Sequence, residues 1–118
     1  TQMHQLFLNL LSNSMKFHRK DVQPSILIEG SVEVGDVGAV ARIAVTDNGI
    51  GFEARHAERI FGMFERLHGR EEFDGTGVGL ATCRKIVEHH SGTLVAWGEP
   101  DAGAVFTITL PIRQTVDA

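Results

Sequence analysis

The sequence predicts a two-layer α/β (α+β) sandwich, in which about three helices cover one face of a mixed, mostly antiparallel sheet. Three observations indicate this fold class. The chain has 118 residues, about the length of one domain. Apolar residues make up 42% of it, which is ordinary for a globular domain. Helical and strand periodicities are mixed along the chain, and the strands occur in pairs. We therefore expect residues 1–118 to form one domain.

Each element is predicted from its own periodicity. The turns GDVG and PDAG each join two strands, and the polar stretch 65–77 has no usable periodicity. We expect that stretch to be a mobile loop that becomes ordered around a ligand. In chain order, the predicted elements are a helix at 1–19, strands at 25–34 and 39–47, helices at 54–64 and 78–90, and strands at 93–99 and 104–111.

Charge and composition narrow the function classes. The net charge of −4 argues against a nucleic-acid partner. No apolar run approaches the roughly 20 residues that a membrane span requires. The single cysteine, Cys83, excludes an internal disulfide and fits a reducing compartment. We expect a cytoplasmic location, which would be the cytoplasmic side of the membrane if the full protein is membrane-bound. Because TQMHQLF is already helical in pattern and no capping signal precedes it, we expect the chain to be a piece of a longer protein.

The first helix carries a narrow polar stripe on an otherwise apolar surface. At about 100° per residue, Gln2, Gln5, Asn9, Asn13 and Lys16 fall on one side. The stripe contains no carboxylate, whereas an ordinary solvated face carries Glu–Lys pairs. Amide oxygens one turn apart can ligate a hard cation such as Mg²⁺, and a lysine one turn further can reach a phosphate. The alternative interpretation is that the stripe is simply the wet side of the helix.

Two glycine-rich stretches are candidate ligand sites. In DNGIGF, Asp47 follows an apolar strand, and its carboxylate could accept a hydrogen bond from an exocyclic amino group. Gly49 and Gly51 would let the backbone pass close under a flat ring, although an ordinary Asp-Asn-Gly hairpin turn is the better interpretation of this stretch alone.

The second stretch, GTGVGLA, precedes a helix N-terminus, where free N–H groups and the helix dipole attract phosphate. It is not a Walker A loop, because Leu80 and Ala81 stand where Lys and Ser or Thr would be. It is not a dinucleotide fingerprint either, because polar GREEFD precedes it and Leu80 takes the sixth position.

The order of these motifs resembles the catalytic and ATP-binding domain of sensor histidine kinases, over nearly the whole chain. NLLSNSMKF is similar to the N box, DNGIGF to the first glycine box and IFGMFERL to the F box. GTGVGLATCRKIVEHHSG is similar to the second glycine box with its helix, and GAVFTITLP to the closing strand. RLHGREEFDGTGVGLA resembles kinases with light-sensing or PAS input modules. The resemblance implies a Bergerat (GHKL) ATP-binding fold.

The resemblance also implies roles for individual residues. Asn13 would ligate Mg²⁺ with Asn9 assisting, Lys16 would approach the phosphates, Phe17 would border the base or ribose, and Asp47 would bind the adenine amino group. The remaining implied ATP contacts are Gly49 and Gly51 near Asp47, Gly75, Thr76, Gly77, Val78, Gly79 and Leu80 around the phosphates, and Arg66 at the γ-phosphate or in domain docking.

Two positions depart from the commoner family pattern. Ser14 stands where alanine is frequent, and His18 stands where threonine is frequent. Neither departure removes a liganding group.

The function implied by the resemblance is ATP-dependent protein histidine kinase activity in two-component signalling. The domain would bind Mg²⁺-ATP and phosphorylate a histidine on a dimerisation domain, a helix pair that precedes residue 1. No histidine here is followed by an acidic residue, as a phosphoacceptor would be, so we expect no autophosphorylation in isolation. Further partners would be a response regulator receiver domain and, in the full-length homodimer, a second copy; the isolated domain would be monomeric. The alternatives are another GHKL ATPase, a serine-directed anti-sigma kinase, or a degenerate binding module.

Overall fold

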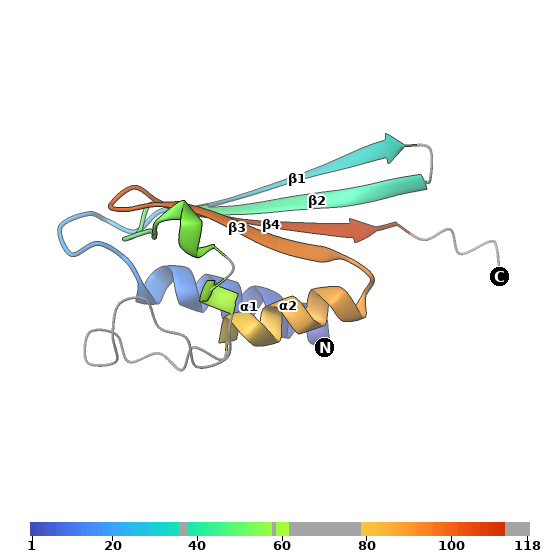
Figure 1. Ribbon diagram of the computed structural model, residues 1–118, viewed down its shortest axis with the longest axis horizontal. Coiled ribbons are helices and arrows are strands. Elements are labelled where there is room, and N and C mark those ends of the chain that lie inside the picture. Colours follow the sequence, from blue (N-terminus) through green and yellow to red (C-terminus); the bar gives the residue numbers. More distant parts are fainter. Residues whose placement is uncertain (36–37, 58, 62–78, 113–118) are drawn as a thin grey trace.

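The computed structural model describes residues 1–35, 38–57, 59–61 and 79–112, and it has two layers (Figure 1). One layer is a four-stranded sheet, and the other consists of two α-helices that lie against one face of it. The elements are α1 (Gln2–Lys16), β1 (Ile26–Gly35), β2 (Gly38–Asp47), the 3₁₀ turns η1 (Ala54–His56) and η2 (Arg59–Phe61), α2 (Gly79–His89), β3 (Thr93–Glu99) and β4 (Gly103–Pro111). The predicted fold class and all four predicted strands are confirmed.

The strand order is β1-β2-β4-β3, and all three pairs in the described part of the chain are antiparallel. The last residue of β2, Asp47, is opposite Ile26 of β1 and Ala104 of β4. Asp47 therefore ends a strand that has neighbours on both sides, which fixes the position of its backbone.

The core lies between the sheet and the two helices. Strand residues at alternate positions face the helices, because side chains along a strand alternate between its two faces. Helix residues three or four apart face the sheet in return. The largest fully buried side chains are Phe106, Leu6, Leu10, Leu94, Ile108, Val45, Val87 and Cys83. This packing holds α1 and α2 in fixed positions over the sheet.

The predicted helix at 54–64 is wrong in type, because the described residues of this stretch form two 3₁₀ turns. Two buried aromatic side chains, Phe52 and Phe61, anchor the segment. The Phe52 ring lies directly over Gly98 of β3, and Phe61 packs edge-on against Phe106 with ring centroids 6.3 Å apart. The backbone between the anchors runs from the sheet toward α2, and short 3₁₀ turns are common in such connections. The described residues thus contain two α-helices rather than about three.

Thr1 caps α1, although no capping signal was expected from the sequence. The Thr1 hydroxyl oxygen accepts a hydrogen bond from the His4 backbone N–H at 3.3 Å, as in many helix N-caps. Neither helix in the described part of the chain is both long and apolar enough to cross a membrane.

Candidate functional site

Asp47 lies where the end of β2 meets the end of α1. β2 stops there because Asn48 turns away from the sheet and binds the connection between α1 and β1. The Asn48 side-chain oxygen accepts from the Ser25 backbone N–H at 2.9 Å, and its amide donates to the Gln23 carbonyl at 3.0 Å. Arg19 donates to the Asn48 carbonyl at 2.9 Å. The stretch is therefore not a hairpin turn, and the role of Asn48 was missed in the sequence.

The Asp47 carboxylate is held by two donors from different parts of the fold. The Ser14 hydroxyl of α1 donates to Asp47 Oδ2 at 3.0 Å, and the Gly49 backbone N–H donates to Oδ1 at 2.9 Å. An ionised carboxylate has about four acceptor positions, so about two remain for a ligand. Sequence reasoning recorded Ser14 only as a departure from the family pattern. No local signal could have shown the contact, since its partners are 33 residues apart.

Gly49 and Gly51 allow close approach between backbone segments of the protein itself. A Cβ atom on Gly49 would lie 2.5 Å from the Phe17 carbonyl oxygen. Gly51 has φ +68°, and a Cβ there would overlap the carbonyl oxygens of Glu99 and Gly103. These contacts hold the loop after Asp47 between the end of α1 and the β3–β4 turn.

Phe17 ends α1 and joins it to this loop. Its N–H donates to the Asn13 carbonyl at 3.1 Å, and its carbonyl accepts from the Ile50 N–H at 2.9 Å. On the other side of the loop, the Asp101 N–H donates to the Ile50 carbonyl at 2.7 Å. The end of α1, the loop and the β3–β4 turn therefore form one connected rim beside Asp47.

The amide stripe of α1 faces α2 in its middle part. Asn9 and Asn13 are half-buried, whereas Lys16 is exposed at the last turn. The Cys83 thiol of α2 donates to the Leu6 carbonyl at 3.7 Å, and burial raises the pKa of Cys83 to about 11. A hydrogen bond with the Asn9 side chain opposes this rise in pKa, which places Asn9 at the contact between the helices. The stripe is thus not merely a solvated side of the helix.

The start of α2 lies toward the end of α1 that carries Asn13, because the two helices run in opposite directions (Figure 1). Cys83 contacts Leu6, so Gly79, one turn earlier in α2, lies further along toward Asn13. Gly79 is the first residue of α2, and Leu80 follows it, half-buried against the core. The first N–H groups of a helix have no partner within the helix, which is why helix N-termini commonly bind anions.

The structure brings together part of the predicted site. Nine predicted contacts belong to the described residues. They lie at three places: on α1 and at its end (Asn9, Asn13, Lys16 and Phe17), at the end of β2 and in the loop after it (Asp47, Gly49 and Gly51), and at the start of α2 (Gly79 and Leu80). Outside the described residues lie the other predicted contacts, Arg66, Gly75, Thr76, Gly77 and Val78, and the whole predicted loop at 65–77. Within the described ranges, no group of three or more His, Cys, Asp or Glu side chains could hold a metal ion.

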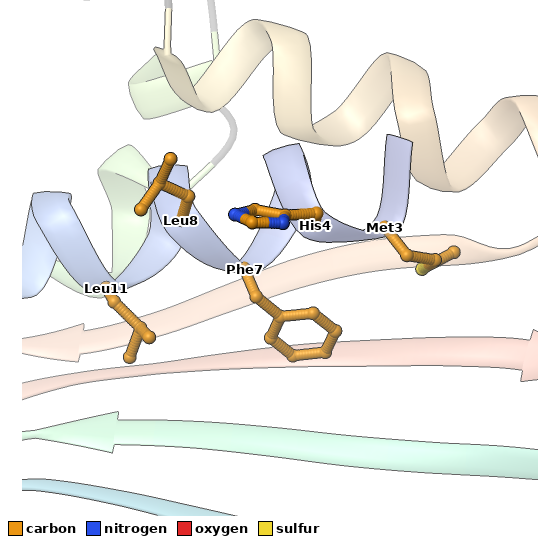
Figure 2. Close-up of a pocket in the computed structure, with 5 residues that line it drawn as sticks. All are labelled: Met3, His4, Phe7, Leu8 and Leu11. Atoms are coloured by element: carbon orange, nitrogen blue, oxygen red, sulfur yellow. The ribbon is translucent and has the colours of Figure 1, made fainter. Parts of the chain in front are cut away.

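A surface hollow of about 380 Å³ lies elsewhere on α1. Figure 2 shows its lining, which comprises Met3, His4, Phe7, Leu8 and Leu11. On the helical wheel His4, Phe7 and Leu11 are opposite Asn9, and Met3 and Leu8 flank them. The hollow is apolar apart from His4, so its chemistry does not suit a phosphate chain.

The sequence of this chain is similar to those of known ATPases and sensor proteins. A family model described as "Histidine kinase-, DNA gyrase B-, and HSP90-like ATPase" matches residues 1–114. The chain belongs to this ATPase family. Among curated relatives, cyanobacterial phytochrome A of Nostoc sp. is 43% identical over 112 residues, which are 95% of this chain and 14% of the phytochrome. The sensor protein KdpD of Escherichia coli is 38% identical over 110 residues, 93% of this chain and 12% of KdpD.

Solved structures of ATPase family members place the chain among the sensor histidine kinases. Full-length ShkA in complex with AMPPNP superposes with a TM-score of 0.74 at 29% identity, covering 93% of this chain and 21% of ShkA. The catalytic domain of the histidine kinase ThkA gives a TM-score of 0.71 at 26% identity, covering 93% of this chain and 67% of that domain. These matches confirm the resemblance to the catalytic ATP-binding domain of a sensor histidine kinase. The chain spans about one seventh of the phytochrome relative.

Proposed function

We propose that this domain binds Mg²⁺-ATP and delivers the γ-phosphoryl group to a histidine on a helical dimerisation domain of the same polypeptide. The phosphoryl group would then pass to a response regulator receiver domain. The observation that carries the proposal is the Asp47 carboxylate, which is held by two donors beside the amide stripe of α1 and keeps acceptor capacity for a ligand. ShkA, a relative by structure, was solved with the ATP analogue AMPPNP.

At the base end, Asp47 would select adenine. Its carboxylate is an acceptor, and the adenine 6-amino group is a donor. Guanine has a carbonyl at that position, so two acceptors would face each other without a proton between them. Phe17, at the neighbouring end of α1, would border the base or ribose.

At the phosphate end, the donor set fits a magnesium nucleotide. Hard cations take neutral amide oxygens as ligands, and Asn13 offers one from a half-buried position. Asn9 would assist, although its contact with Cys83 makes Asn13 the stronger candidate. The ion would neutralise negative charge on the phosphates. Lys16, Arg66, Gly75, Thr76, Gly77, Val78 and the first N–H groups of α2 at Gly79 and Leu80 would bind and orient the phosphate oxygens.

Catalysis on this domain would consist of positioning and charge neutralisation, without a covalent step on its own residues. The acceptor histidine would come from the helical domain, so the isolated domain would hydrolyse ATP slowly at best. In the full-length protein we place this domain on the cytoplasmic side, in a homodimer, whereas the isolated domain would be a monomer.

Titration calorimetry with ATP, with and without Mg²⁺, tests the binding part of this proposal. A longer polypeptide that includes the helical domain then tests phosphoryl transfer from labelled ATP. We expect acid-labile, alkali-stable phosphohistidine, which is lost when the acceptor histidine is replaced by glutamine. Absence of nucleotide binding would instead indicate a degenerate binding module. ATP hydrolysis without phosphohistidine, or phosphoserine on a partner, would indicate one of the related ATPase or anti-sigma kinase classes.

A further inference from the structure

We propose that Ser14 is a positioning residue for base recognition, whose hydroxyl orients the Asp47 carboxylate toward the amino group of adenine. This inference rests on the proposed nucleotide function and adds a residue to it. Ser14 lies on α1 directly after Asn13, and its side chain reaches across to the end of β2.

The two donors to Asp47 come from different layers and bind different oxygens. Ser14, in the helix layer, donates to Oδ2, while the Gly49 N–H, at the end of the sheet, donates to Oδ1. The terminal torsion of an aspartate side chain is soft, so a single donor leaves the carboxylate plane free to turn. With one donor on each oxygen, the plane is fixed, and the remaining lone pairs point in fixed directions.

The Ser14 hydroxyl is directed at Asp47 rather than at its own helix. A serine inside a helix can satisfy its hydroxyl by donating to the carbonyl four residues earlier. Here the proton goes to a carboxylate 33 residues away. Ser14 is also the only buried polar side chain in the described part of the protein, at 3% exposure. Packing alone would accept alanine there, so the hydroxyl serves the carboxylate rather than the core.

Losing this donor should affect recognition of the amino group selectively. Without Ser14, Oδ2 can rotate or take a water molecule, and either change competes with the hydrogen bond from the 6-amino group. Contacts to the ribose, the phosphates and the metal ion do not involve Ser14 and should be unchanged. The effect should therefore depend on whether the nucleotide carries the amino group.

The test compares Mg²⁺-ATP with the Mg²⁺ complex of purine riboside triphosphate, which lacks the 6-amino group. Dissociation constants are measured by calorimetry for the wild-type chain and for Ser14→Ala. The matched control is Ser12→Ala, on an exposed position of the same helix. We expect Ser14→Ala to weaken ATP by about three- to tenfold and to leave the analogue unchanged, because one modest hydrogen bond is lost. Ser12→Ala should match the wild type with both ligands.

A second variant, Ser14→Cys, keeps the shape of the side chain with a larger sulfur atom and offers only a weak donor. It should follow Ser14→Ala, and it decides the question if the alanine variant does not fold. Circular dichroism and thermal melting check the fold of each variant. Equal weakening of both nucleotides, or no weakening of either, would overturn the inference while leaving the proposed function intact. A wild-type chain that binds no ATP would overturn the proposed function, and with it this inference.

Discussion

Replacement of Asp47 by asparagine tests base recognition most directly. The substitution keeps the size of the side chain but turns one carboxylate oxygen into an amide group that only donates. The remaining oxygen can accept from the Gly49 N–H or from the Ser14 hydroxyl, but not from both in the present geometry. The new amide therefore faces either the Ser14 hydroxyl, at the Oδ2 position, or the Gly49 N–H, at the Oδ1 position. The Gly49 N–H cannot turn away, so the amide takes the Oδ2 position, where it also faces the incoming amino group of adenine.

The expected loss follows from these contacts. The Ser14 hydroxyl can turn and accept from the new amide, so we expect the fold to survive. The adenine amino group has no such freedom, because it only donates. Loss of a hydrogen bond to a charged acceptor, with a donor left facing a donor, costs about 2–3 kcal/mol. ATP affinity should therefore fall by about 30- to 150-fold.

The assay is titration calorimetry with Mg²⁺-ATP and Mg²⁺-GTP on the wild-type chain and on Asp47→Asn. Asp21→Asn is the matched control, because Asp21 is exposed in the connection between α1 and β1. It should bind like the wild type, which should itself prefer ATP strongly. Equal affinity of the wild type for both nucleotides, or an Asp47→Asn variant that binds ATP normally, would refute the role of Asp47.

Three further predictions concern the metal, the loop and the thiol. Asn13→Ala should weaken Mg²⁺-ATP far more than metal-free ATP in calorimetry, and equal losses would make Asn13 only structural. Gly51→Ala should lower the free energy of unfolding in urea by about 2–4 kcal/mol, because the new Cβ sits at positive φ against two carbonyl oxygens. Gly30→Ala, where a Cβ has ordinary space, should change it by less than about 0.5 kcal/mol, and similar costs at both glycines would contradict this argument. Cys83 should resist Ellman's reagent at pH 8 until the chain unfolds. Folding raises the pKa of the Cys83 thiol from 9.0 to about 11, so as the pH rises the thiol loses its proton in the unfolded chain first. The free energy of unfolding of the wild type should therefore fall between about pH 9 and 11, relative to that of Cys83→Ala. A parallel pH dependence of both proteins would show that the thiol does not contribute.

The sequence alone was enough to predict most of the fold. Strands β2 and β4 and helix α2 begin and end within one residue of their predicted limits. Periodicity succeeds here because each of these strands and helices buries one face. The buried face sets the spacing of apolar residues along the chain, and that spacing is visible in neighbouring residues. The turn chemistry of Gly and Asp separated these elements correctly. The same local reading failed at 54–64, where two buried phenylalanines that contact β3 and β4 override the helical pattern.

For the candidate site too, the sequence indicated which residues to consider, whereas the contacts between them appear only in the tertiary structure. Asp47, the asparagines of α1 and the glycines could be named as candidates from the sequence, because their residue types and spacing suit nucleotide chemistry. Only the tertiary structure decided what surrounds them. It directed the Ser14 hydroxyl to Asp47, placed Asn9 beside Cys83, and pressed Gly49 against the end of α1. Each contact joins residues far apart in the chain, so it depends on how the helix layer sits on the sheet, and that geometry is set by packing of the whole core rather than by local pattern.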